Sequence, residues 1–145
     1  MAEVQFRFRD DDPVADAMVT VDAFAAQAEA SAVRIEPGDE VRDLLPQLAR
    51  LRLVEVNFPA FTDGRGMSAA RILREAGYTH ELRAVGAVQV DQLAAMRRCG
   101  FDSFAPDVPI DPADAERALA RWPAVYQRAA DGRAPLWALR HGDAA

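Results

Sequence analysis

LVEVNF, the run Leu53–Phe58, is the stretch that decides the fold. Its β-branched and aromatic residues are typical of a strand, and it ends where Pro59 and two nearby glycines interrupt regular structure. A helix-spaced apolar pattern follows, and residues 82–88 are the next strand-like run. Strands that alternate with helices of about ten residues predict right-handed βαβ units and a mainly parallel sheet in an α/β domain.

Charged residues inside these two strands bear on the choice between two α/β architectures. Glu55 lies between two valines, and Arg83 lies between Leu82 and Ala84, so each strand has one apolar face and one charged face. Central strands of a flavodoxin-like doubly wound sheet are covered on both faces and are apolar throughout. The pattern therefore favours a partial (βα) barrel slightly over a doubly wound sheet, and a homodimer would let two partial barrels complete each other. The alternative is that both strands lie at sheet edges, with Glu55 and Arg83 in solvent.

Turn signals and composition divide the chain into three parts. Residues 1–13, with three consecutive aspartates before Pro13, are expected to be a flexible acidic segment. Residues 14–130 are expected to form a single α/β domain, and residues 131–145 a loose tail. Besides the elements above, the sequence predicts strands at 18–21, 33–35 and 101–104, and helices at 24–30, 41–51, 69–76, 91–98 and from Asp111-Pro112 to Trp122.

Composition excludes several kinds of site. The chain has no lysine, so its 17 basic residues are all arginines, and Schiff-base chemistry and a P-loop lysine are ruled out. Cys99 is the single cysteine, which excludes an intramolecular disulfide, a self-ligated iron–sulfur cluster and a cysteine-rich zinc site. A net charge of −6 argues against general nucleic-acid binding, and no apolar stretch is long enough to cross a bilayer. We expect a cytoplasmic protein without nucleic-acid or membrane partners, and we assign it no cofactor and no metal.

The loop and helix after Leu53–Phe58 form an arginine-rich candidate site. Ligands of parallel α/β folds bind where strands end and helices begin, and residues 57–68 are expected to occupy that position. Ser68 is expected to cap the helix. The predicted anion-binding residues are Arg65, Ser68, Arg71 and Arg83, with Arg74 nearby, and the candidate acid–base residues are Asp63 and Asp91. The same arginines could instead pair with Glu55, Asp63, Glu75 and Asp91.

Cys99 is the third catalytic candidate. Neighbouring Arg97 and Arg98 would lower the pKa of its thiol and make it more reactive. The carbonyl end of the preceding helix works against a thiolate, and a free cysteine is more often a small buried apolar residue. The second interpretation is therefore favoured.

Several short runs of this sequence occur together in a known bacterial family. They are 58–65 (FPAFTDGR), 68–74 (SAARILR), 81–86 (ELRAVG), 91–92 (DQ) and 98–104 (RCGFDSF). In these runs the chain resembles the family catalogued as domain of unknown function 934. The resemblance implies a protein encoded beside sulfite reductase and sulfate-assimilation genes, of the kind described as a probable oxidoreductase of sulfite reduction. Ala87 and Val90 depart from the family pattern, which has an acidic and a basic residue there.

Two functions of different classes remain open. The first is an accessory protein of assimilatory sulfite reduction, which docks on sulfite reductase or on its electron donor without turning over substrate. The second is a small enzyme that binds an anionic metabolite at the arginine-rich edge of the sheet, with an aspartate as acid–base partner. The lack of redox ligands, the acidic composition and the gene context that the resemblance implies favour the first.

Overall fold

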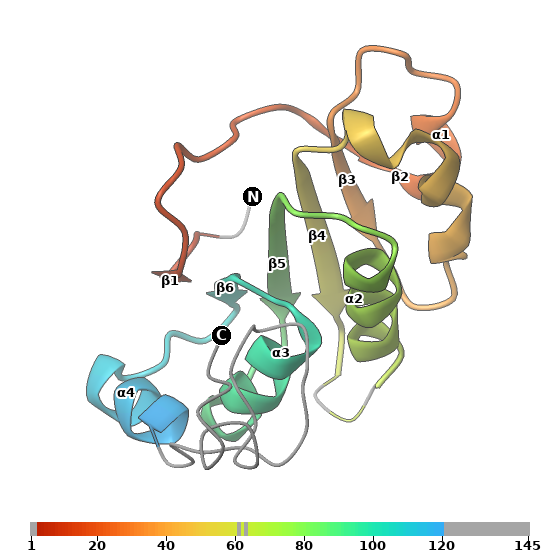
Figure 1. Cartoon of the computed structure of the whole chain (residues 1–145). Coiled ribbons are helices and arrows are strands. Elements are labelled where there is room, and N and C mark those ends of the chain that lie inside the picture. The colour runs from red at the N-terminus through yellow and green to blue at the C-terminus, as the bar shows by residue number, and fades with distance from the viewer. Residues whose placement is uncertain (1–2, 61, 63, 121–145) are drawn as a thin grey trace, which may run out of the picture.

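A computed structural model describes residues 3–60, 62 and 64–120 of the chain. One six-stranded sheet runs through it in the order β1-β6-β5-β4-β3-β2 (Figure 1). All neighbouring strands are parallel except β1, which is antiparallel to β6. The strands are β1 (Phe6–Arg7), β2 (Met18–Thr20), β3 (Ala32–Ile35), β4 (Leu53–Phe58), β5 (Glu81–Gly86) and β6 (Ser103–Pro106). The predicted α/β class with a mainly parallel sheet is confirmed.

The order of the parallel strands decides between the two architectures. From β2 to β6 each strand lies beside the one before it, and the direction never reverses. Right-handed crossovers that all step in one direction place every helix on one face, whereas a doubly wound sheet reverses its order. The described part of the chain therefore has the strand order of a (βα) barrel, but β1 and β2 remain edges and the sheet does not close. The crossover helices are α1 (Val21–Phe24), η1 (Val41–Arg50), α2 (Arg65–Glu75), η2 (Val90–Gln92) and α3 (Leu93–Cys99), and α4 (Pro112–Ala120) follows β6.

The hydrophobic core lies between the sheet and these helices. Val54, Val56 and Phe58 of β4 point toward α2, and Phe58 meets Phe101 edge to face at 5.8 Å between ring centroids. The start of α2 lies so close to β4 that a Cβ on Gly66 would be 2.6 Å from the Phe58 ring. Glycine is required there because any side chain would push the helix away from the sheet.

The N-terminal segment, expected to be flexible and acidic, contributes β1 to the sheet. Phe6 and Phe8 alternate with Arg7 and Arg9, which is the period of a strand. Phe6 packs against the core, while both arginines donate to the carboxylate of Asp11. Pairing with arginines offsets the repulsion between the consecutive aspartates that pointed to disorder.

Two predicted helices differ from the structure. The predicted helix at 24–30 is wrong: α1 ends at Phe24, and Arg50 donates to the carbonyls of Phe24 and Gln27, which supports a turn in place of a longer helix. The helix predicted at 41–51 is a 3-10 helix with a kink at Gln47, next to Pro46. Trp122 and the predicted tail lie outside the described residues. No helix in residues 3–120, apart from the two undescribed positions, is long and apolar enough to cross a membrane.

Candidate functional site

A row of polar side chains crosses the face of the sheet opposite the core. Strand register places one residue from each of the six strands at the same level, and paired residues of neighbouring strands point to the same side. We call these residues the polar row: Arg7, Thr20, Arg34, Glu55, Arg83 and Ser103. In a closed barrel this face would be the lumen.

The centre of the polar row is a buried ion cluster. Arg83 is 4% exposed and donates from Nη1 to Glu55 Oε2 at 2.9 Å, and Glu55 is itself 2% exposed. The other terminal nitrogen of Arg83, Nη2, donates to Glu81 Oε2 at 2.9 Å. Arg34 approaches Glu55 from the other side, at 3.8 Å. A buried ion pair costs about as much in desolvation as it gains in attraction, so its presence is weak evidence for a purely stabilising role.

Glu81 lies two residues before Arg83 on β5, on the same face of the sheet, and contacts the polar row. Its surroundings favour the ionised form of its carboxylate. Burial acts most strongly on it and opposes the charge, but hydrogen bonds from Ser103, Arg83 and Arg7 together outweigh burial and lower its pKa from the ordinary value. The Ser103 hydroxyl donates to Oε2 at 2.7 Å, and Arg7 Nε donates to Oε1 at 3.0 Å. These three hydrogen bonds therefore favour the ionised form of Glu81.

One donor of the cluster has no acceptor. Arg83 Nε is buried and makes no hydrogen bond, and within the described residues it is the single buried side-chain nitrogen or oxygen in that state. Most buried polar atoms of folded proteins are paired, and a specific exception requires an explanation. Clusters of buried, mutually perturbed charges are also enriched at functional sites.

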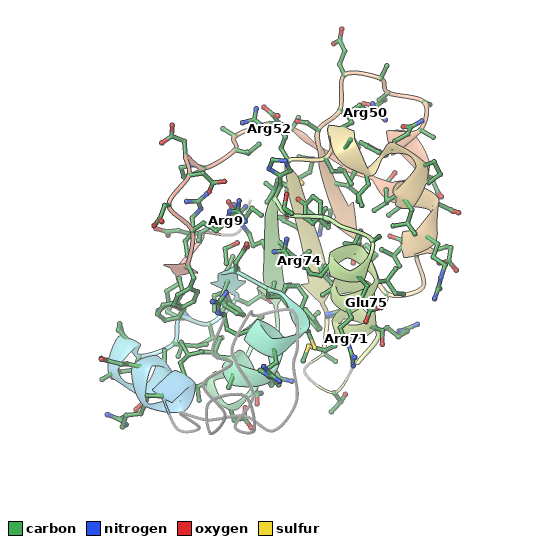
Figure 2. The ribbon with its side chains drawn as sticks, in the orientation of Figure 1. Arg9, Arg50, Arg52, Arg71, Arg74 and Glu75 are labelled. Carbon is green, nitrogen blue, oxygen red and sulfur yellow. The ribbon has the colours of Figure 1, made fainter. Side chains whose placement is uncertain are left out.

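A second cluster of charged side chains lies where the parallel strands β5 and β6 begin. Asp102 accepts from Leu82 N at 2.9 Å, from Arg9 Nη1 at 2.7 Å and from Arg74 Nη2 at 3.0 Å. Arg74 also donates to the carbonyls of Gly100, Tyr78 and His80. Figure 2 shows Arg74 directed from α2 toward the sheet and Arg9 on the segment that leaves β1. Arg74 therefore connects α2 to the segments that precede β5 and β6, and its role is structural.

The opposite edge, where the parallel strands end, contains a pocket of about 220 Å³. We call it the edge pocket; its polar lining is Glu36, Asp39, Glu40, Arg42, Asn57, Arg65 and Ser68. Asn57 donates to Glu36 Oε2 at 2.7 Å, and Arg34 donates to Glu36 Oε1 at 3.0 Å. Because Arg34 also belongs to the polar row, the pocket and the buried cluster are joined by one continuous set of polar contacts.

Comparison with known proteins gives a family without an assigned activity. The family model described as "Bacterial protein of unknown function (DUF934)" matches residues 32–137. The chain belongs to this family. The DUF934 match spans β3 to α4 and so includes Arg34, Glu55, Arg83 and Ser103. No curated protein and no solved structure matches the chain.

Ala87 and Val90, the two positions expected to differ from the family pattern, lie close to the edge where the strands end. Ala87 follows β5 and donates its backbone N–H to the Phe58 carbonyl at 2.7 Å. Val90 begins η2 and packs against the core. Neither position belongs to the polar row.

The structure separates the predicted anion-binding residues. Arg65 and Ser68 both line the edge pocket, and Arg71 is exposed on the outer side of α2 (Figure 2). Arg83 does not join them, because it points to the opposite face of the sheet. The expected cap at Ser68 is wrong: α2 begins at Arg65 with Gly64 as N-cap and no side-chain cap bond, so Ser68 lies in the first turn.

The catalytic candidates also lie apart. Asp91 is exposed in η2, and Asp63 falls outside the described residues. Cys99 is half-buried at the end of α3, and burial raises the pKa of its thiol despite the opposing effect of Arg71 and Arg98. Among residues 3–60, 62 and 64–120, no three His, Cys, Asp or Glu side chains are grouped so that they could hold a metal ion.

Sequence reasoning missed Arg7, Arg34, Glu81 and Ser103. Arg34 and Glu81 had a readable signal: Arg34 lies between Val33 and Ile35, as Arg83 lies between apolar neighbours, and Glu81 precedes Arg83 by two residues and so shares its face. The alternation of Phe6 and Phe8 with Arg7 and Arg9 gave a signal for the face of Arg7, but the places of Arg7 and Ser103 in the row depend on strand register.

Proposed function

We propose that this DUF934 protein is an accessory protein of assimilatory sulfite reduction that docks on sulfite reductase or on its electron donor. The pathway is suggested by the sequence resemblance, which links the family to sulfite reductase genes. The observation that carries docking is an apolar groove between β1 and α4. Its volume is about 410 Å³, and its lining includes Phe6, Phe8, Ala115 and Leu119.

Phe8 is an exposed aromatic residue in the lining of this groove. Its ring packs edge to face on Phe104, and the Arg97 guanidinium lies 4.7 Å from the ring centroid, so the ring is held in place. Even so, Phe8 is 43% exposed, which is high for a large apolar side chain. A rigid, half-exposed aromatic ring in a groove is typical of the anchors on which protein interfaces depend.

The charge around the groove specifies the partner. Asp10 and Asp12 follow Phe8 along the chain and are exposed, and Glu116 lines the groove itself. A fitting partner therefore offers an apolar side chain flanked by basic residues. We assign that role to a surface of sulfite reductase or of its electron donor.

Co-purification tests the proposal. The protein is expressed with and without the neighbouring sulfite reductase and its electron donor, and co-elution and dissociation constants are recorded. Phe8→Asp should abolish co-elution, whereas Val108→Asp should preserve it, because Val108 is 76% exposed but does not line the groove. With about 200 Å² for a phenylalanine side chain, the exposed 43% of Phe8 could contribute about 2 kcal/mol on burial, or roughly 30-fold in affinity.

Two results would contradict docking at this groove. One is equal co-elution of the Phe8→Asp and Val108→Asp variants. The other is a melting temperature that falls in Phe8→Asp alone while co-elution is unchanged, because that result assigns the groove to the chain's own residues. A chromophore in the absorption spectrum of the protein alone would favour an enzyme instead.

The edge pocket favours a second candidate function, a small enzyme acting on an anionic metabolite. Arg65 and Ser68, two of the predicted anion-binding residues, line this pocket at the edge where α/β folds bind ligands. Arg65→Ala should remove any thermal stabilisation by phosphate or sulfate, and Arg71→Ala, on the exposed side of the same helix, should not. Equal stabilisation of both variants would remove this candidate.

A further inference from the structure

The unpaired Nε of Arg83 lies on a face of the sheet that neither proposed function uses. The two terminal nitrogens of this guanidinium are occupied by Glu55 and Glu81, each at 2.9 Å. Nε has no acceptor although it is buried. A buried charged donor is destabilising when it lacks a partner, so this position is suited to an acceptor supplied from outside the chain.

The charges of the cluster select the kind of acceptor. Three arginines, Arg7, Arg34 and Arg83, contact two carboxylates, those of Glu55 and Glu81. Among these groups the arginines therefore outnumber the carboxylates by one, while Asp11 and Glu36 contact Arg7 and Arg34 from the rim at 2.7 and 3.0 Å. Solvent screens these two exposed carboxylates more strongly.

We infer that the polar row is a binding site for a small oxyanion or carboxylate, one oxygen of which accepts the hydrogen bond from Arg83 Nε. Guanidinium groups fit such ligands because their planar N–H donors match two oxygens of a carboxylate, sulfate or phosphate. Arg34 supplies the second positive charge. It is 39% exposed and touches Glu36 of the edge pocket, so the ligand reaches the row from the edge where the parallel strands end.

The site is distinct from both proposals above. It uses neither the groove at Phe8 nor Arg65, whose helix lies on the other face of the sheet. Anion binding that depends on Arg83 and survives Arg65→Ala belongs to this site. If only Arg65→Ala loses anion binding, the anion binds in the edge pocket.

Arginine side-chain NMR tests the inference on the full chain. The Nε–H signal of Arg83 is assigned as the one missing in Arg83→Lys, a variant that keeps the positive charge between the glutamates but has no Nε donor. Sulfate, phosphate, acetate and succinate are titrated separately, so that the spectra distinguish a tetrahedral oxyanion from a carboxylate. One class is expected to shift the Arg83 Nε–H signal and to raise the melting temperature.

Matched variants separate a site from a general salt effect. Arg83→Lys should bind the ligand about tenfold more weakly or worse, the loss expected for one charge-assisted hydrogen bond. Arg52→Lys changes an exposed arginine at the N-terminal edge of the sheet and should bind as the wild type does (Figure 2). Glu55→Gln removes one negative charge beside the site and should tighten binding.

Three results would overturn the inference. They are an Arg83 Nε–H signal that no anion moves at millimolar concentration, equal binding by Arg83→Lys and Arg52→Lys, and an Arg83 Nε–H that exchanges with water as fast as that of Arg52. If Arg83→Lys does not fold, Glu55→Gln decides the question, because unchanged or weaker anion binding in that variant contradicts the site.

Discussion

Replacing Arg83 by methionine should be among the most damaging single changes in this chain. Methionine is also long and unbranched, but it leaves the carboxylates of Glu55 and Glu81 without the cation that lies 2.9 Å from each. Removing one partner of a buried ion pair typically costs about 3–5 kcal/mol. Against a total stability of about 5–15 kcal/mol, that loss should lower the melting temperature by roughly 10 °C or more.

The dependence of this loss on pH provides a second check. In the wild type, the lowered pKa of Glu81 contributes stability that is present above the carboxyl's unfolded pKa and is lost as pH falls through its folded pKa. In Arg83→Met, Glu81 keeps its hydrogen bonds from Arg7 and Ser103 but loses the one from Arg83. Burial then opposes its charge more strongly, and folding favours proton uptake more than in the wild type. The destabilisation should therefore be largest near pH 8 and smaller near pH 5.

Urea unfolding at both pH values measures the effect, with Arg52→Met as the matched control at an exposed position. A difference of less than about 1 kcal/mol between the two variants, which is within the range of ordinary surface substitutions, would refute the reasoning. So would a penalty in Arg83→Met that is the same at pH 5 and pH 8.

Two further predictions concern packing and reactivity. Gly66→Ala places a methyl group 2.6 Å from the Phe58 ring and should lower the free energy of unfolding in urea by about 1–3 kcal/mol. The added methyl group of Gly64→Ala meets nothing within 4 Å, so this control should change stability far less. Equal effects of the two substitutions would contradict the close approach of α2 to β4. Burial raises the pKa of the Cys99 thiol, so iodoacetamide should react with Cys99 more slowly at pH 7 than with a cysteine in an unfolded peptide. The reaction rate should still be rising above pH 9. A faster reaction than that of the peptide at pH 7 would contradict the raised pKa.

Local sequence was sufficient to find strands β3, β4 and β5. The runs at 33–35, 53–58 and 82–88 correspond to β3, β4 and β5 because apolar, β-branched residues outweigh any competing helical pattern there. Charges at alternate positions also favoured the barrel-like order slightly over the doubly wound one, and each strand does bury only one face against helices. The edges were harder: β1 spans two residues in an acidic segment and depends on partners about 100 residues away.

The candidate site was predictable only in part. The pairing of Arg83 with Glu55 was one of the alternatives that the sequence allowed, because both lie on charged faces of strands. The expected convergence of Arg83 with Arg65 did not occur, because residues on opposite faces of a sheet cannot meet across it. Sequence periodicity identifies the face of the sheet to which a side chain points. Strand register decides which residues of neighbouring strands lie side by side, and the sequence of a single strand does not determine its register.

The pairing of β1 with β6 also sets an order for folding during synthesis. Strands β2 to β5 can join the sheet one after another as they leave the ribosome, since each pairs with the strand made just before it. β1 is made first but must wait for Ser103 and Phe104, so its arginines remain without their final partners until the sheet is otherwise complete. A nascent chain that stalls before β6 would therefore expose Phe6 and Phe8 together with an unpaired edge of β5, a combination that favours aggregation or capture by a chaperone.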